Sequence, residues 1–111
     1  MSFYSADSPV WHPYTQMHNT EIIPIVSGKR AYVYDEQGNR YIDAVASWWT
    51  NLHGHAHPHI ANAIAAQAHK LEQVIFAGFT HEPAEQLATK LLGRIPFHQK
   101  IFYTDNGSTA V

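Results

Sequence analysis

The end of this 111-residue chain carries the side chains best suited to chemistry. A short β-prone run, residues 101–103, leads into a Gly107-Ser108-Thr109 turn, and residues 110–111 look like the opening of a helix. A strand, a turn and a helix start would direct backbone N–H groups, two hydroxyls and the positive end of a helix dipole at one point. A phosphate group fits such a point, with Gly107 and Ser108 as its candidate ligands. The alternative is a simple helix cap, which uses the same residue types, and Asp105 is expected to serve that turn.

The histidines suggest a second chemistry. The chain has nine, and four of them alternate along residues 53–59. Neutral imidazoles bind zinc, copper or nickel when they converge. Gly54 and Pro58 interrupt the run, however, and no carboxylate or thiol lies nearby in the sequence. The pattern therefore favours a loop and helix start over a metal site.

Two aromatic segments, residues 11–15 and Ser47-Trp48-Trp49, have no periodicity of their own. Residues 11–15 must therefore pack on another part of the protein or on a second subunit. Tyr14 and Trp48 each combine a large apolar ring with a polar tip, which suits the wall of a ligand pocket. Simple core packing is the alternative for at least one of the indoles.

The elements that must position these residues follow from local patterns. Residues 31–34 and 40–43 are β-prone and flank turn residues, which predicts a hairpin. Pro58 predicts a helix start, and a second helix is expected from a Thr80 cap to Gly93. A strand is expected over residues 100–104. The first helix is expected to bury a stripe of Ile60, Ala63, Ile64, Ala68, Leu71 and Ile75, and the second an inner face of Ala84, Leu87, Ala88 and Leu91. Two helices, a strand and a helix start predict an α/β layer.

Composition excludes several classes of protein. The formal net charge is −2, and the basic residues form no stripe along the sequence that would bind nucleic acid. The absence of cysteine excludes disulfides, thiolate metal sites and a cysteine nucleophile. The chain begins without the basic and apolar regions of an export signal, and no apolar run approaches the ~20 residues that cross a bilayer. We therefore expect a cytoplasmic protein that binds neither nucleic acid nor membrane. A helix that has only begun at Val111 suggests the front part of a longer protein.

Five segments, taken in order and spacing, resemble a known family. They are residues 11–15, 47–49, 54–58, 80–84 and 105–111. The Gly-His-x-His-Pro and Gly-Ser segments resemble class III aminotransferases, which use pyridoxal 5′-phosphate (PLP). The Trp-His-Pro-Tyr and Ser-Trp-Trp segments narrow the resemblance to the adenosylmethionine–8-amino-7-oxononanoate aminotransferases of biotin biosynthesis. The resemblance implies the N-terminal part of a fold type I transferase, with residues 1–46 in the small domain and 47–111 opening the PLP-binding large domain.

The resemblance also implies roles for single residues. Gly107 and Ser108 would hold the cofactor phosphate, while Trp48 and Tyr14 would contact the substrate. S-adenosylmethionine would donate the amino group, 8-amino-7-oxononanoate would accept it, and the enzyme would be a homodimer. The family's lysine that binds PLP covalently lies further along than Val111, so no catalytic residue is assigned here and the chain alone is expected to be inactive. Two alternatives stay open: another class III enzyme acting on ω-amino acids, and a non-enzymatic histidine-rich metal-binding module.

Overall fold

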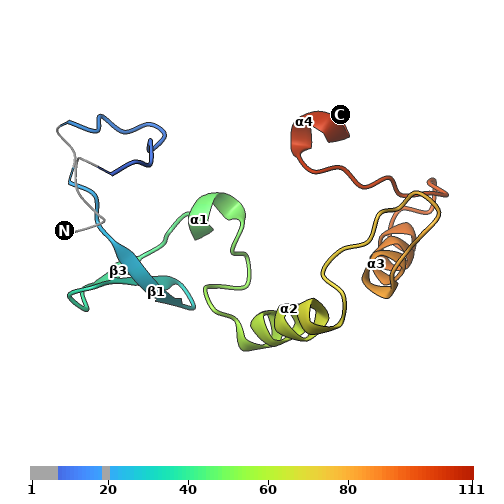
Figure 1. Cartoon of the computed structure of the whole chain (residues 1–111), viewed down its shortest axis with the longest axis horizontal. Helices are drawn as coiled ribbons and strands as arrows, with labels where there is room; N and C mark the ends of the chain where they lie inside the picture. Colours follow the sequence, from blue (N-terminus) through green and yellow to red (C-terminus); the bar gives the residue numbers. More distant parts are fainter. Residues whose placement is uncertain (1–7, 19–20) are drawn as a thin grey trace. The chain divides into compact units, whose positions relative to one another are not determined.

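A computed structural model describes residues 8–18 and 21–111 of the chain. The first seven residues, on which the expectation of no export signal rests, lie outside the described residues. Contacts divide the chain into residues 1–66 and residues 67–111, and each unit is described by itself. Figure 1 shows the element order, from the strands β1 to β3 through the helices α1 to α4.

The first unit is built on a three-stranded antiparallel sheet with the order β1-β2-β3. β1 is Ile25–Lys29, β2 is Tyr32–Asp35 and β3 is Arg40–Ile42. The predicted hairpin is confirmed as β2 and β3, in a register that pairs Val33 with Tyr41. The sequence pattern did not identify β1, which pairs with β2 across an irregularity between Ile25 and Ser27.

Asp35 organises the turn between β2 and β3, and it is 4% exposed. Its carboxylate accepts hydrogen bonds from the N–H groups of Gln37 and Asn39, at 3.0 and 2.8 Å. It also accepts from the Asn39 amide and the Tyr41 hydroxyl, each at 2.9 Å. Burial alone would raise the pKa of Asp35, but these hydrogen bonds outweigh it and lower the pKa. The buried Asp35 carboxylate therefore stabilises the turn through hydrogen bonds to residues close to it in the sequence.

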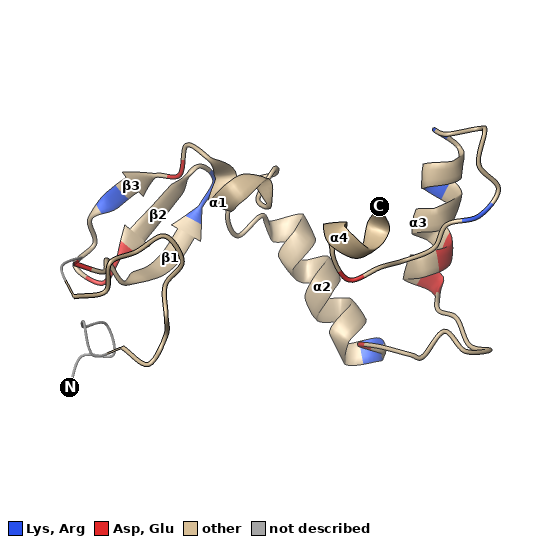
Figure 2. Cartoon of the chain, turned by 90° about the horizontal axis from the view of Figure 1, so that it is seen from above, with Lys and Arg blue, Asp and Glu red and all other residues tan. Residues whose placement is uncertain are grey.

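α2 and α3 begin close to the predicted positions, but the residue that caps α3 differs from the predicted one. α2 is Pro58–Lys70 and α3 is Glu82–Leu92, with Gly93 as its C-cap. The predicted Thr80 cap is wrong: the His81 ring accepts from the Ala84 N–H, at 3.4 Å, while the Thr80 hydroxyl donates to Glu85, at 2.6 Å. Glutamates lie in the first turn of α3 and a lysine in its last, as Figure 2 shows, and this order complements the helix dipole.

Two further expectations are wrong. Residues 100–104 form no strand, because a β-prone run needs a neighbouring strand and none pairs with it among the described residues. The apolar stripes of α2 and α3 are not buried: Ile64 is 65% exposed and Leu87 is 48% exposed. Across the described residues neither helix packs on another helix or strand. On α3, Ala84 and Ala88 of the expected inner face are half-buried, together with Leu92, so the expectation for this helix is correct for the two alanines only.

None of the helices in the described ranges combines the length and the apolar character needed to cross a membrane. Figure 2 also shows that positively and negatively charged residues are interspersed along the chain in these ranges.

Candidate functional site

The segment that carries Trp48 has an unusual backbone. α1, Ala46–Trp49, has φ of 48°, 48°, 57° and 67° at its four residues, and none of them is glycine. This is a left-handed turn, which costs L-residues roughly 1–2 kcal/mol each relative to the right-handed form. Such a run persists only where the surroundings over-determine it, and it is a common property of functional sites.

Asp43 supplies much of that constraint. Its Oδ2 accepts a hydrogen bond from the Ser47 hydroxyl, at 2.8 Å, and lies 2.7 Å from Nε2 of His55. Together these bonds, that from Ser47 first, lower the pKa of Asp43 to about 2. Asp43 is therefore ionised at neutral pH and joins the left-handed turn to the loop that carries His55.

His55 is fixed to the sheet through its own backbone. Its N–H donates to the Arg30 carbonyl, at 2.8 Å, and its carbonyl accepts from the Arg30 N–H, at 3.1 Å. Gly54, at φ +83°, makes this approach possible, because a Cβ there would lie 2.9 Å from the Arg30 Cα. The Asn51 amide lies 3.3 Å from Nδ1 of His55, so the ring donates from Nε2 to Asp43 and accepts at Nδ1.

The two predicted substrate residues meet in this unit. The rings of Tyr14 and Trp48 lie 5.5 Å apart between centroids and are tilted by 56°. Tyr14 also has a positive φ, of 55°. The pair faces outward, since Tyr14 is 91% and Trp48 60% exposed. Residues 34 positions apart in the sequence thus form one open aromatic surface, and its contact with a substrate stays a prediction.

The predicted phosphate-binding residues open α4, Gly107–Ala110, in the second unit. Asn106 is the N-cap, and its side chain accepts from the Thr109 N–H, at 3.0 Å. Asp105 accepts from the Thr109 hydroxyl, at 3.1 Å, which confirms that it serves the turn. In the described ranges, the N–H groups of Gly107 and Ser108 and the Ser108 hydroxyl donate to no other residue. Three donors are therefore available at one helix start, and their binding of phosphate stays a prediction.

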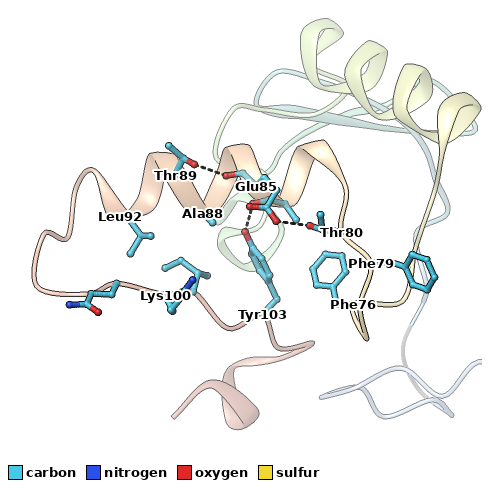
Figure 3. A pocket seen from close by; sticks show the side chains of 12 residues that line it. Phe76, Phe79, Thr80, Glu85, Ala88, Thr89, Leu92, Lys100 and Tyr103 are labelled. Carbon is cyan, nitrogen blue, oxygen red and sulfur yellow. Dashed lines mark hydrogen bonds between the residues drawn. The ribbon is translucent and has the colours of Figure 1, made fainter.

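The second unit also contains a hollow of about 370 Å³, drawn in Figure 3. Phe76 and Phe79 lie on one side of it, and the Tyr103 hydroxyl donates to the Ala84 carbonyl of α3, at 2.7 Å. The Tyr103 ring also makes an edge contact with Phe76, at 6.2 Å between centroids. This contact network ties residues 76–80 and 99–103 to α3. Neither Gly107 nor Ser108 is among the residues that line the hollow.

The histidine run does not converge. Within the part of the chain that the structure describes, no three histidine, aspartate or glutamate side chains form a group that could hold a metal ion. His53 and His57 make an edge contact at 6.3 Å between ring centroids, and His55 turns to Asp43 instead.

Sequence reasoning missed Asp43 and the structural role of His55. Their contact joins residues twelve positions apart, one at the end of a strand and one in an irregular loop. Neither helical nor strand periodicity relates such positions. The usable signal was Asp43 four residues before Ser47, a spacing at which a short polar side chain can bond back to a carboxylate.

Comparison with known proteins gives the family. The model of the family "Aminotransferase class-III" matches residues 14–111. The adenosylmethionine-8-amino-7-oxononanoate aminotransferase of Synechococcus elongatus is 50% identical over 104 residues, which are 92% of this chain and 24% of that protein. The enzyme of the same name from Geobacter sulfurreducens is 43% identical over 106 residues, 92% of this chain and 23% of that protein. The chain thus spans about a quarter of the length of these relatives.

Solved structures agree with this match. The ω-transaminase of Pseudomonas jessenii in complex with PMP superposes with a TM-score of 0.81 at 33% identity, over 91% of this chain and 23% of that one. The PMP-bound aminotransferase of Vibrio fluvialis gives a TM-score of 0.86 at 28% identity, over 99% of this chain and 26% of that one. The chain has the mixed α/β structure of the N-terminal part of these enzymes. With a family match over nearly all of its length, the chain belongs to the class III aminotransferases.

Proposed function

We propose that the full-length protein carrying this chain is the PLP-dependent aminotransferase that moves the amino group of S-adenosylmethionine to 8-amino-7-oxononanoate and forms 7,8-diaminononanoate for biotin. The observation that carries this proposal is the 50% identity to an adenosylmethionine-8-amino-7-oxononanoate aminotransferase over 92% of the chain. From the same likeness we propose a fold type I enzyme that works as a cytoplasmic homodimer. In it, residues 1–46 belong to the small domain and residues 47–111 open the large domain.

The residues at the start of α4 fit the cofactor's phosphate. The Gly107 and Ser108 N–H groups and the Ser108 hydroxyl are donors, and a phosphate monoester offers charged acceptor oxygens. An added Cβ at Gly107 would meet nothing within 4 Å, so the approach to these donors is open. When bound, PLP supplies the electron sink and carries the amino group. The role of this turn is to hold and orient it.

Tyr14 and Trp48 form the proposed substrate surface. The amino-oxononanoate has a carboxylate at one end, an amino ketone at the other and an aliphatic chain between them, and an exposed aromatic pair can cover such a chain. No described residue bonds to the Tyr14 hydroxyl, so it is free to hydrogen-bond a polar substrate atom. The indole of Trp48 then acts as a wall that excludes water from the chain.

The test uses the full-length protein and follows 7,8-diaminononanoate formation from both substrates. Complementation of a biotin auxotroph that lacks this activity gives a second readout. Tyr14→Phe should lower kcat/KM for the amino acceptor by on the order of tenfold or more, since one substrate hydrogen bond is lost. Tyr34→Phe removes the same hydroxyl from β2 and is the matched control. Wild-type kinetics in Tyr14→Phe, or loss of cofactor together with activity, would refute the assignment of Tyr14.

A second candidate is an ω-transaminase, because the ω-transaminase of Pseudomonas jessenii superposes with a TM-score of 0.81, against 0.72 for an adenosylmethionine-8-amino-7-oxononanoate aminotransferase from Methanocaldococcus jannaschii. The latter is nevertheless more similar in sequence, at 39% identity. Turnover of an ω-amino acid with pyruvate, without turnover of S-adenosylmethionine, would favour this candidate.

A further inference from the structure

The left-handed turn at Ala46–Trp49 determines where the Trp48 indole points. Trp48 is 60% exposed, and its ring contact is to Tyr14. A ring this open is not held by packing, so its direction depends on the backbone beneath it. Ser47 precedes it at φ 48° and ψ 55°, and Trp48 itself is at φ 57° and ψ 50°. Relaxation of these residues to the right-handed region would move the indole away from Tyr14.

Backbone hydrogen bonds close the turn but do not determine whether it is left-handed or right-handed. The Trp49 N–H donates to the Val45 carbonyl, at 2.9 Å, and the Asn51 N–H to the Ala46 carbonyl, at 3.0 Å. A right-handed turn makes bonds of the same kind at lower conformational cost. The bond specific to this conformation is the one from Ser47, whose hydroxyl donates to the Asp43 carboxylate at 2.8 Å.

The far side of that carboxylate is anchored. His55 Nε2 lies 2.7 Å from Oδ2 of Asp43, and the His55 backbone exchanges two hydrogen bonds with Arg30, the residue that follows β1. The side chains of Asp43 and His55 are only 11% and 16% exposed, so water competes poorly for these bonds. The chain of contacts thus runs from Arg30 through His55 and Asp43 to Ser47, and it ends next to Trp48.

We propose that Asp43, fixed by His55 and bonded to Ser47, is a positioning residue that holds the Trp48 indole against Tyr14 and so sets the affinity for the amino acceptor. Asp43 touches no substrate itself and acts through the backbone of Trp48. This inference rests on the proposed function, because it takes the pair of rings as the substrate surface.

The test compares Asp43→Asn with Asp35→Asn in the full-length protein. Both changes replace a carboxylate that accepts several local hydrogen bonds, but Asp35 serves only the turn between β2 and β3. Asp43→Asn should raise KM for the amino acceptor about five- to tenfold with little change in kcat and in bound cofactor. Asp35→Asn should leave this KM unchanged. Equal KM values for the two variants would overturn the proposal.

A thermodynamic cycle separates positioning from general damage. If Asp43 acts through Trp48, Asp43→Asn should change kcat/KM by less than about twofold when Trp48→Ala is already present. If the two losses simply multiply, the proposal is wrong. His55→Gln, which keeps an N–H donor for Asp43, should restore most of the kcat/KM that His55→Ala loses, and equal losses in these two variants would contradict the proposal.

Amide exchange tests the contact without any assay of turnover. The Trp49 N–H, which donates to the Val45 carbonyl across the turn, should exchange about tenfold faster in Asp43→Asn than in Asp35→Asn, and unchanged exchange would overturn the proposal. Should Asp43→Asn fail to fold, Ser47→Ala removes one hydroxyl and should show the same rise in KM. If the full-length protein does not turn over the two proposed substrates, the proposed function fails, while the exchange experiment still decides whether Asp43 holds the turn.

Discussion

Gly54→Ala tests the close contact between the loop that carries His55 and Arg30, the residue that follows β1. Gly54 has φ +83°, and an added Cβ would lie 2.9, 3.0 and 3.1 Å from the Cα, O and C atoms of Arg30. These are backbone atoms, which cannot move aside as the end of a side chain can. The methyl group must therefore push the loop from Arg30 and break the two hydrogen bonds between Arg30 and His55.

The expected loss follows from two contributions. Alanine at a positive φ costs about 1 kcal/mol relative to glycine. Two broken backbone hydrogen bonds add about 0.5–1.5 kcal/mol each. The opening free energy of this contact should therefore fall by about 2–4 kcal/mol, which corresponds to amide exchange roughly 30-fold to several hundredfold faster.

The measurement is hydrogen–deuterium exchange at the Arg30 and His55 amides of the full-length protein. Gly38→Ala is the matched control, because Gly38 has φ +84° and an added Cβ there meets nothing within 4 Å. Gly38→Ala should lower the free energy of unfolding only by the cost of alanine at a positive φ, about 1 kcal/mol. It should leave the Arg30 and His55 amides protected from exchange. Equal effects of the two substitutions on these amides would refute the close approach.

Three other predictions follow from the described contacts. Ser108→Ala in the full-length protein should weaken PLP binding by about 1–3 kcal/mol, measured by equilibrium titration, and unchanged affinity would mean that the hydroxyl serves only the turn. Because the pKa of Asp43 is lowered to about 2 in the folded protein, its stabilising effect is fully present above the unfolded-state pKa of about 3.9 and is lost as pH falls through 2. Exchange at the Trp49 amide, which closes the turn next to Asp43, should accordingly rise between about pH 4 and pH 2, and an Asp43→Asn variant should lack this rise. The 111-residue chain alone, incubated with PLP and borohydride, should show no stoichiometric labelling at one defined lysine by peptide mass analysis, and a single labelled lysine would contradict the inactivity expected for this length of chain.

Local patterns predicted the elements whose signals are local. Turn residues between two β-prone runs identified β2 and β3, and Pro58 and Gly93 marked a helix start and a helix end. β1 could not be predicted because Ser27-Gly28-Lys29 has no strand pattern. This segment is a strand because its backbone pairs with β2. The same dependence on a partner explains the opposite error over residues 100–104, which are β-prone but unpaired.

The site was harder to predict because its geometry depends on long-range contacts. The rings of Tyr14 and Trp48 were singled out by type, but their contact joins two segments without periodicity. The left-handed turn carries no sequence signal, since Ala46, Ser47 and Trp48 are not residue types that favour positive φ. The contact between Asp43 and His55 could not be predicted because it depends on the fold, which places the residue after β3 beside an irregular loop.

The left-handed backbone has a consequence for attempts to widen the proposed pocket by replacing Trp48. A substitute at this position must tolerate φ 57° as well as fit the ligand. Glycine and asparagine meet that condition at low cost, whereas valine, isoleucine and threonine have branched Cβ atoms that crowd the carbonyl in this region. A library built on side-chain volume alone would therefore confuse two effects, because variants of equal size would differ in whether the turn survives. Redesign of substrate range at this site is limited first by main-chain conformation and only then by the shape of the pocket.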